Sequence, residues 1–473
     1  MLKINFAESF DLSKLFGIPD FTSYSATVNF IIGIFYTVFA IMMLHFVFFA
    51  IVGIFKRKTY PHTDEKLKYG IIIPARNEEA VVGQLIDSIK RNKYPQDKLH
   101  IFLIAHNCDD NTAEIGRKMG ATVYEYNNPD ECTMGYAFKY LFSKIEEDYG
   151  TQNYDGFFLF NADNVLDENY FDKMNDAFVA GEKKNVITSF RNSKNFGSNT
   201  ISACYGLYFV YGCRFESRGR TALGCSTRVQ GTGYVVNAET VKNGWQYVTL
   251  TEDWEFTADQ ILQDTKIQFC DEAVFYDEQP TNLRVMWRQR LRWAKGHLLV
   301  CVTRLKDIIK GIFKGKKKGG TSRKGSTYDI MVNILPVCVI TTALFLINTV
   351  LLCLSPLFGE SLMDTLVPYL IRLGMGMAGS YALMILASIV IYIIEGKRIK
   401  GVKLGMKIWS CLIWPIFLMV SVPAEIVALF VRNLGWKTIP HTDTTGFGDL
   451  NGGCDEDKGD NDIEQNKISA AIE

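Results

Sequence analysis

The sequence predicts an α/β domain inserted between transmembrane helices. Long apolar runs lie near the start and in the last third of the 473 residues, whereas residues 67–298 read as a soluble domain. Within that middle part, short apolar stretches alternate with amphipathic ones. Such alternation is typical of a parallel sheet covered by helices on both faces.

Composition narrows the class of protein. The formal net charge is zero, so the overall charge balance gives no support for a nucleic-acid partner. The 11 cysteines show no CxxC pairs or zinc-type spacing. Several lie in apolar runs, where cysteine behaves as a small hydrophobic residue. A reduced, cytosol-facing protein is therefore favoured over a disulfide scaffold.

Four apolar runs are long enough to predict membrane spans, which need about 20 apolar residues. After an N-terminal segment, 1–28, the run 29–55 meets a basic triplet and lacks the features of a cleaved signal peptide. The runs 330–354, 373–394 and 404–430 follow, the last interrupted by Pro415 and Pro423. We expect about three spans within 330–432. Buried core helices are the alternative, which the length of the runs disfavours.

Basic residues predict the orientation of these spans. Lys56-Arg57-Lys58 and the cluster Lys397, Arg398, Lys400 and Lys403 belong on the cytoplasmic side by the positive-inside rule. The middle domain is then cytoplasmic in a multi-pass protein of the cell membrane. Residues 299–329 predict an interfacial helix followed by a basic Gly/Lys loop. The acidic tail, 446–473, predicts disorder.

Strands are expected at 69–74, 100–105, 122–126 and 157–160, with helices at 79–91, 112–119 and 135–147 between them. Ligands of such sheets bind at the carboxyl ends of the strands. The segments that follow three of these strands, 75–78, 106–109 and 161–164, therefore hold candidate site residues.

Three motifs have residue types that can bind a metal, accept a proton or contact phosphates and sugars. Asp163 follows an apolar strand and can bind Mg²⁺ or Mn²⁺, although Asn and Asp also cap ordinary turns. Glu252 and Asp253 can supply a general base, or can cap a helix start. The segment 287–293, WRQRLRW, combines guanidinium groups that match phosphate with aromatic faces that stack on sugars. An amphipathic helix at a membrane surface would show the same residues.

The order of these motifs resembles the membrane-integrated family 2 glycosyltransferases, which include the cellulose, hyaluronan and poly-N-acetylglucosamine synthases. The resemblance covers about residues 69–297 and implies a GT-A-like nucleotide-sugar-binding fold. It also implies a metal-dependent hexosyltransferase that uses Mg²⁺ or Mn²⁺. By position, Asp163 would meet the metal, and Asp253 would be the catalytic base with Glu252 beside it. The resemblance assigns donor binding to Pro74, Arg76, Glu78, Asn161, Asp163, Gln289 and Arg292, and acceptor binding to Gly231, Thr232, Gly233 and Trp293.

Three positions depart from the family pattern. Asn161 replaces the first aspartate of the DxD turn. His106-Asn107 stands where many members have acidic residues for the nucleotide base. Met134 occupies the place of a lysine that usually approaches the phosphates. The first departure is tolerable because Asp163 remains, whereas the last two leave the identity of the donor open.

The resemblance implies a processive, inverting enzyme that polymerises a UDP-sugar into a β-linked extracellular polysaccharide and exports it. Its partners would be the UDP-sugar, the growing polysaccharide, the lipid bilayer and accessory export proteins. One alternative is a non-processive enzyme that adds a single sugar to a lipid acceptor. A catalytically silent membrane protein would not need Asp163, Asp253, Gln289, Arg292 and Trp293 together. A secondary transporter would show internal repeats, which this chain lacks.

Overall fold

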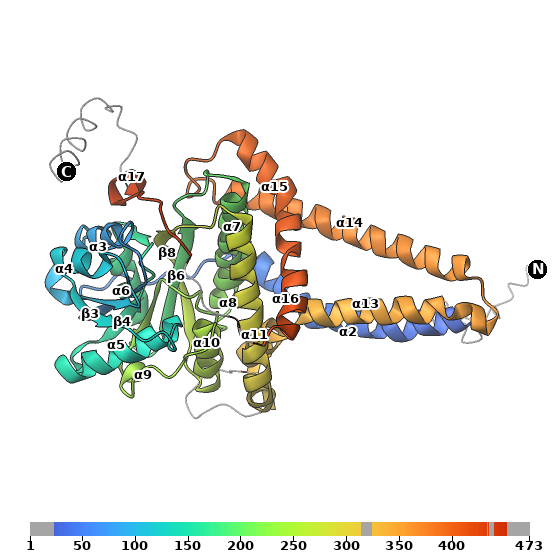
Figure 1. The fold of residues 1–473 in the computed structure, drawn as a ribbon, viewed down its shortest axis with the longest axis horizontal. Helices are drawn as coiled ribbons and strands as arrows, with labels where there is room; N and C mark the ends of the chain where they lie inside the picture. Colours follow the sequence, from blue (N-terminus) through green and yellow to red (C-terminus); the bar gives the residue numbers. More distant parts are fainter. Residues whose placement is uncertain (1–22, 314–323, 433, 435–438, 452–473) are drawn as a thin grey trace, which may run out of the picture.

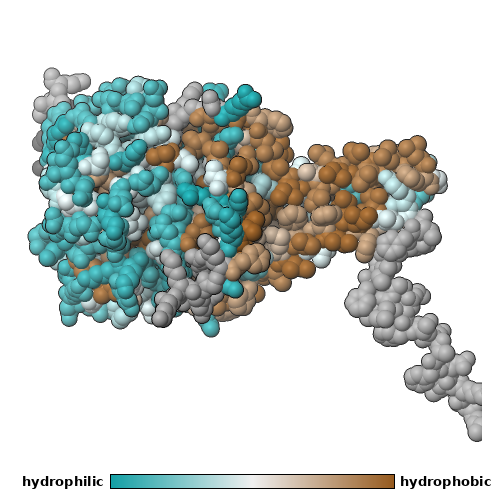
Figure 2. Space-filling model, turned by 90° about the horizontal axis from the view of Figure 1, so that it is seen from below, coloured by the Kyte–Doolittle hydropathy of each residue, from teal (hydrophilic) through white to brown (hydrophobic). Residues whose placement is uncertain are grey.

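The computed structural model describes residues 23–313, 324–432, 434 and 439–451 (Figure 1). This part of the chain forms a mixed α/β domain from which an arm of long apolar helices extends (Figures 1 and 2). The sequence therefore predicted the general plan correctly.

An eight-stranded sheet forms the centre of the α/β domain, in the order β3-β2-β1-β4-β7-β6-β8-β5. Its strands are β1 (Tyr69–Ala75), β2 (Leu99–His106), β3 (Thr122–Tyr126), β4 (Gly156–Leu159), β5 (Val165–Leu166), β6 (Val186–Ser193), β7 (Tyr234–Asn237) and β8 (Ile267–Asp277). The expected strands are confirmed to within two residues. The expectation of a parallel sheet is only partly correct, because β7 runs antiparallel to β4 and β6, and β5 runs antiparallel to β8.

The geometry of one turn explains the reversal at β7. Tyr234, the first residue of β7, pairs with Leu159, the last residue of β4. The chain thus returns to the sheet at the carboxyl edge of β4, and a strand that enters at this edge must run in the opposite direction. The strands β1, β4, β6 and β8 remain parallel to one another, so their carboxyl ends share that edge.

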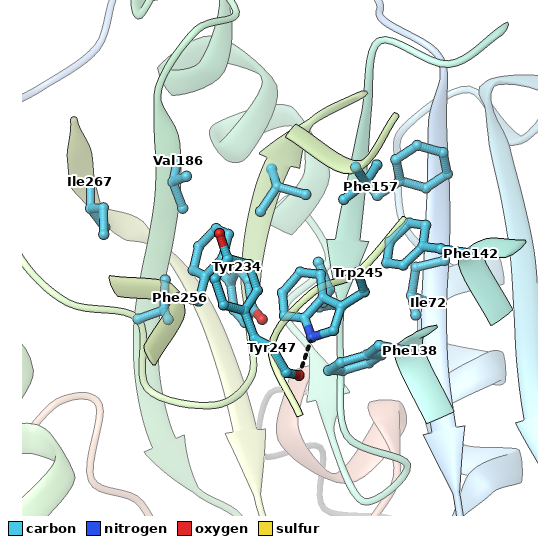
Figure 3. Packing of buried hydrophobic residues seen from close by; sticks show 14 of the residues in the cluster. Ile72, Phe138, Phe142, Phe157, Val186, Tyr234, Trp245, Tyr247, Phe256 and Ile267 are labelled. Carbon is cyan, nitrogen blue, oxygen red and sulfur yellow. Dashed lines mark hydrogen bonds between the residues drawn. The ribbon is translucent and has the colours of Figure 1, made fainter. Parts of the chain in front are cut away.

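Two hydrophobic cores lie on opposite faces of the sheet. Alternate residues of a strand point to opposite faces, and in β1 Ile71 and Ile73 enter one core whereas Ile72 enters the other. The helices α3 (Val82–Lys90) and α6 (Tyr170–Ala180) cover the first face. The helices α5 (Met134–Asp148) and α10 (Glu252–Leu262) cover the second. Phe138 and Phe142 of α5 surround Trp245 there (Figure 3).

The remaining helices of the domain are α4 (Thr112–Lys118), α7 (Thr200–Tyr211), α8 (Arg218–Ala222), α9 (Ala238–Val241) and α11 (Leu283–Phe313), and a π-helical segment, Gly212–Ser217, joins α7 to α8. Helix α11 is continuous, so the expected domain end at residue 298 lies inside a helix rather than at a boundary.

Within the part of the chain that the structure describes, three helical stretches are long and apolar enough to cross a membrane: α2 (Tyr24–Phe55), α14 (Leu362–Ile394) and the stretch Leu404–Phe430. A fourth span is possible if α12 (Lys324–Ile334) and α13 (Val337–Cys353), bent by 57°, count as one. These helices associate the protein with a membrane. The large apolar side chains of α2, α13 and α14 form the hydrophobic arm that projects from the domain (Figures 1 and 2).

The structure changes the expected bounds of several segments. Helix α2 begins five residues before the expected run 29–55, and α14 begins well before residue 373. The stretch 404–430 divides at Val420 into α15 (Leu404–Met419) and α16 (Ser421–Phe430), three residues before Pro423. The tail expected to be disordered from Gly446 begins instead with helix α17 (Phe447–Asn451). Most of the basic loop, residues 314–323, and the rest of the tail, from 452 onward, lie outside the described residues.

Candidate active site

Acidic side chains gather at the carboxyl edge of the sheet, in a group that we term the acidic pocket. Glu78 follows β1, Asp163 follows β4, and Asp277 and Glu278 stand at the end of β8. Asp163 is buried, and its carboxylate accepts hydrogen bonds from Asn164 Nδ2 at 3.1 Å and from the backbone N–H of Glu278 at 3.0 Å. Two of the predicted donor residues, Glu78 and Asp163, thus share one pocket, as the strand-end argument expected.

His441 enters this acidic pocket from the C-terminal part of the chain. Its Nδ1 lies 2.9 Å from Glu78 Oε2, and its Nε2 lies 3.9 Å from Asp163 Oδ2. Burial alone would lower the pKa of His441, but the carboxylates of Asp163, Glu78 and Glu278 raise it to about 9. Burial raises the pKa of Glu78, and His441 opposes that rise. The imidazolium therefore balances part of the buried negative charge.

Backbone contacts hold the segment around His441, residues 439–446, which we term the C-terminal strap. The Glu278 carboxylate accepts the N–H groups of Thr442 at 3.0 Å and Asp443 at 2.9 Å. Lys194 Nζ donates to the carbonyl of Asp443 at 2.6 Å. The strap therefore crosses the carboxyl edge of the sheet beside Asp163.

Arg191 connects the acidic pocket with a second pocket. Its Nε donates to Asp277 Oδ2 at 2.7 Å, and its Nη1 donates to the carbonyl of Gln230 at 2.8 Å. Burial raises the pKa of Asp277 to about 6, against the lowering effect of Arg191 and together with the charge of Asp163. Arg191 also lines the second pocket.

This second pocket is a cavity of about 160 Å³ between the sheet edge, the start of α10 and one face of α11. Seven predicted site residues line it: Asn161, Gly231, Glu252, Asp253, Gln289, Arg292 and Trp293. Segments that are far apart in the chain therefore meet around one cavity: Asn161 of the turn that carries Asp163, the acidic pair, and residues of the segment 287–293.

Glu252 and Asp253 form an acidic pair at the start of α10, in which Glu252 is buried and Asp253 is half-buried. Burial, and then the neighbouring Asp253, raise the pKa of Glu252 to about 8. Burial also raises the pKa of Asp253, against a hydrogen bond from the Trp254 backbone and the charge of Arg292. Close to neutral pH, the pair can thus hold one proton and one negative charge, which suits a proton acceptor.

Gly231 lies directly beside this pair. Its φ of +78° falls in the left-handed region that glycine favours, and a methyl group added there would lie 3.7 Å from Asp253 Oδ2. The turn at Gly231 thus brings backbone next to the acid without a side chain between them.

Aromatic rings form the wall opposite the acids. Trp293 lies nearly parallel to Tyr208 of α7, with ring centroids 6.3 Å apart. Tyr205 meets Trp293 edge-on at 6.2 Å and Phe417 of α15 at 4.9 Å. The aromatic wall therefore connects the cavity to the helices of the membrane arm.

Buried oxygens without a hydrogen-bond partner point to a polar ligand. Asn161 Oδ1, Gln230 Oε1 and Gln289 Oε1 have none, and all three residues line the cavity. Together with Asp163, Asn161 offers a hard, oxygen-only donor set of the kind that Mg²⁺ and Mn²⁺ prefer. Among the described residues, no three His, Cys, Asp or Glu side chains form a ready metal cage. A cation would therefore share its coordination with donor diphosphate and water, and the residues present fit such a site.

Other predicted residues lie outside the cavity. Pro74 is buried within β1, and Arg76 follows that strand. The Thr232 hydroxyl accepts the backbone N–H of Asn161 at 2.9 Å and so fixes the turn that carries Asp163. Gly233, with φ of +69°, leaves room for the Phe275 ring, which an added Cβ would meet at 2.2 Å. Thr232 and Gly233 thus stabilise the backbone around the site. Their contact with an acceptor stays a prediction.

The positions that depart from the family pattern also have defined places. Met134, the first residue of α5, lines the cavity. His106 Nε2 lies 2.7 Å from the carbonyl of Glu131, and its ring lies parallel to Tyr126 with centroids 5.5 Å apart.

Sequence reasoning missed Arg228, His297 and His441. His297 follows Gln289 and Trp293 at intervals of four residues on α11, so helical spacing could have placed it on the same face. Its ring meets Trp254 edge-on at 4.1 Å, and burial together with Arg228 lowers its pKa to about 3. No local signal marked His441, a single histidine in a polar tail.

Comparison with known proteins indicates the family and the fold. Residues 67–296 match the family model described as "Glycosyltransferase like family 2". A probable glycosyltransferase of Bacillus subtilis, YdaM, is 23% identical over 245 residues, covering 51% of this chain and 58% of that protein. A poly-beta-1,6-N-acetyl-D-glucosamine synthase of Staphylococcus epidermidis is 24% identical over 237 residues, covering 48% and 53%. A beta-monoglucosyldiacylglycerol synthase of Trichormus variabilis is 23% identical over 281 residues, covering 58% and 56%.

The chain spans about half the length of the curated relatives it matches. Among solved structures, a mannosyltransferase from Pyrobaculum calidifontis, in complex with GDP-Man and Mn²⁺, aligns with a TM-score of 0.50 at 11% identity. The alignment covers 85% of this chain and 98% of that one, and it supports a GT-A-like fold. The chain therefore belongs to the family 2 glycosyltransferases, with a GT-A-like domain flanked by apolar, membrane-associated helices.

Proposed function

We propose that this protein transfers a sugar, with inversion, from a UDP-sugar to the hydroxyl of a growing polysaccharide, so that a β-linked polymer forms. One observation carries the proposal: a half-buried acid, Asp253, lines the same cavity as an aromatic platform, Trp293, and a cation, Arg292. These are the groups needed to take a proton, to hold a sugar face and to balance leaving-group charge.

The donor would lie across the two pockets. Asp163 and Asn161 would hold Mg²⁺ or Mn²⁺, which when bound neutralises the charge of a diphosphate. Glu78 and Arg76 would face the nucleotide, and Arg292 with Gln289 would contact the diphosphate from the α11 side. Arg191 keeps these parts in register, because it joins Asp277 to the Gly231 turn through the Gln230 carbonyl.

Asp253 would accept the proton of the attacking hydroxyl as the new glycosidic bond forms. Glu252, whose pKa burial and the neighbouring Asp253 raise to about 8, would stay protonated and leave Asp253 ionised. Trp293 and Tyr208 would stack on the acceptor sugar and hold its hydroxyl near Asp253. Attack from the side opposite the leaving diphosphate inverts the anomeric centre, so an α-linked donor gives a β-linked product.

The product would leave through the membrane arm. The aromatic wall reaches α15, and basic residues near the spans favour a cytoplasmic catalytic domain in the cell membrane. Delivery of the polymer to the outside, alone or with accessory export proteins, would follow from that orientation. The basic loop 315–326 would either approach the donor phosphates or hold the domain against anionic lipid.

A second candidate acceptor is a lipid, to which a single sugar would be added. The contact of the aromatic wall with Phe417 of α15 favours it, because a membrane-embedded acceptor could approach along this helix. The family relatives likewise include both a polysaccharide synthase and a glycolipid synthase.

One experiment tests the proposal and separates these acceptors. Membranes that contain the protein are incubated with radiolabelled UDP-sugars, singly and in pairs, with Mg²⁺ or Mn²⁺. A high-molecular-weight product that β-linkage-specific hydrolases digest supports the polymerase. A labelled product that extracts into organic solvent identifies the lipid acceptor. Release of free sugar alone, or no turnover with any donor, contradicts both.

A further inference from the structure

Two neighbouring cavities lie in the membrane arm, away from the active site. One, of about 550 Å³, is bordered by α2, α13 and the start of α14. The other, of about 1070 Å³, lies between α14 and the helices α2, α13 and α15. They share Tyr36, Tyr369 and Arg372, so they form one continuous space along α14. In Figure 1, α14 diverges from α13 and α2 along this stretch.

The two cavities differ in chemistry. The smaller lies at the end of the arm farthest from the catalytic domain, and its polar lining includes Asn29, Asn348, Asp364 and Thr365. The larger runs toward the catalytic domain, and most of its surface is apolar, with Gly376, Met377, Pro415 and Met419. The combined space therefore suits an amphiphile, with its polar head distal and its hydrocarbon chain along α14.

Two buried polar groups in the smaller cavity lack partners. Tyr369 is 8% exposed, and its hydroxyl makes no hydrogen bond. Asn348 is 2% exposed, and while its Nδ2 donates to Asn29 Oδ1 at 3.5 Å, its own Oδ1 has no donor. Leaving such groups unpaired in an apolar environment is destabilising, so they indicate a polar ligand.

Arg372 adds a positive charge at the junction of the two cavities. It lies ten residues from the start of α14, which is about 15 Å along the helix axis. Among the described residues, no carboxylate lies within ion-pair distance of it, although such pairs are common elsewhere in the protein. Its side chain is exposed, and it directly precedes the apolar run 373–394, where an arginine can reach lipid phosphates at the membrane surface. Its guanidinium matches a phosphate.

We propose that this space binds a phospholipid of the leaflet distal to the catalytic domain. Its phosphate would form an ion pair with Arg372 and accept a hydrogen bond from the Tyr369 hydroxyl. Asn348 Oδ1 would accept a hydrogen bond from the head group. Asp364 suits an ammonium there, which favours an ethanolamine head. An acyl chain would fill the larger cavity. A glycan does not fit as well, because the apolar lining of that cavity cannot satisfy a row of sugar hydroxyls.

The test uses the full-length protein, reconstituted in nanodiscs and then purified in mild detergent. Native mass spectrometry and labelling with a photoactivatable phosphatidylethanolamine measure the bound lipid. The wild type should retain about one phospholipid. Arg372→Gln should lower retention at least tenfold, Arg372→Lys should restore part of it, and Tyr369→Phe should lower it several-fold. Lys397→Gln removes a charge outside the arm and should change nothing.

A matched pair of glycine variants keeps the test independent of Arg372. A Cβ at Gly374 or at Gly376 meets no atom within 4 Å, but only Gly376 lines the larger cavity. Gly376→Phe should therefore expel the acyl chain and lower lipid retention, whereas Gly374→Phe should leave it unchanged.

Several outcomes would overturn the proposal. Equal lipid retention by the wild type and Arg372→Gln would show that Arg372 does not bind the lipid phosphate. Equal lipid retention by the two glycine variants would show that the larger cavity does not hold an acyl chain. Binding of inorganic phosphate at millimolar concentration, with no phospholipid retained, would show that the site binds an anion and not a lipid. Labelling by a photoactivatable oligosaccharide, and not by lipid, would show a glycan path instead.

Discussion

His441 Nδ1 lies 2.9 Å from Glu78 Oε2, although 363 positions separate the two residues in the chain. This contact places the C-terminal strap over the part of the site where we propose that the donor binds. With Nε2 of the same ring 3.9 Å from Asp163, one imidazolium balances two buried carboxylates. A substitution that frees the strap should therefore alter the donor site, and a change at the donor site should alter the strap.

The first prediction concerns His441→Ala. Loss of its contacts with Glu78 and Asp163 leaves the strap held by the Glu278 and Lys194 contacts alone. Amide exchange at Thr442 and Asp443 should then become faster by about tenfold, a loss of roughly 1.4 kcal/mol of local stability. Hydrogen–deuterium exchange mass spectrometry measures it. His62→Ala, at an exposed histidine that also pairs with an aspartate, is the control. Unchanged exchange would mean that the backbone contacts suffice.

The second prediction concerns the cation. Asp163→Asn keeps the shape of the side chain but removes the charge that attracts a hard cation. Turnover should fall by at least about 10²-fold, as it should for the wild type in EDTA, and Mn²⁺ added back should rescue only the wild type. Asp167→Asn, on the same stretch of chain but away from the pocket, serves as the control. Full activity of Asp163→Asn, or of the wild type in EDTA, would contradict the assignment.

The third prediction concerns the proton acceptor. Asp253→Asn cannot take the proton of the acceptor hydroxyl, so glycosyl transfer should fall by about 10²–10⁴-fold. UDP binding, measured by calorimetric titration, should persist. Glu252→Gln mimics the protonated neighbour and should retain far more activity than Asp253→Asn. A rate near the wild-type value for Asp253→Asn would leave this residue as a helix cap only.

The fourth prediction concerns the aromatic wall. Trp293→Ala removes the stacking platform, which should raise the KM for the acceptor by about tenfold, since stacked aromatic contacts contribute about 1 kcal/mol or more. UDP affinity should stay within about twofold, as the proposed diphosphate contacts do not involve the indole. Trp293→Phe should restore part of the acceptor affinity. An equal loss of UDP affinity would show that Trp293 supports the donor instead.

The fifth prediction concerns pH. The pKa of His297 is lowered to about 3 in the folded protein, whereas the unfolded chain takes up this proton near the ordinary pKa of about 6.5. Between these values the unfolded state binds more protons, so stability should fall as pH decreases. The contribution is at most about 1.4 kcal/mol per pH unit. His297→Gln should show a flatter loss of melting temperature from pH 6.5 to 4.5. Parallel curves for both proteins would contradict the assignment.

The sequence by itself determined the local elements and the residue types of the site. Apolar strands such as Ile71–Ile73, helices with one apolar face such as α5, and long apolar runs each depend on a periodicity that neighbouring residues carry. The position of Asp163 after a strand followed from the same local reasoning. The family resemblance then named Asp253, Arg292 and Trp293, and the structure places all three around one cavity.

Only the tertiary structure decided which of these residues meet, and what else joins them. The antiparallel entry of β7, the unbroken course of α11 and the approach of His441 to Glu78 each depend on contacts between distant segments. No local pattern encodes such contacts, because the free energy that selects them comes from burial and charge balance in the assembled fold. The role that we propose for Arg372 likewise depends on the tertiary structure, because the cavities beside α14 indicate its ligand.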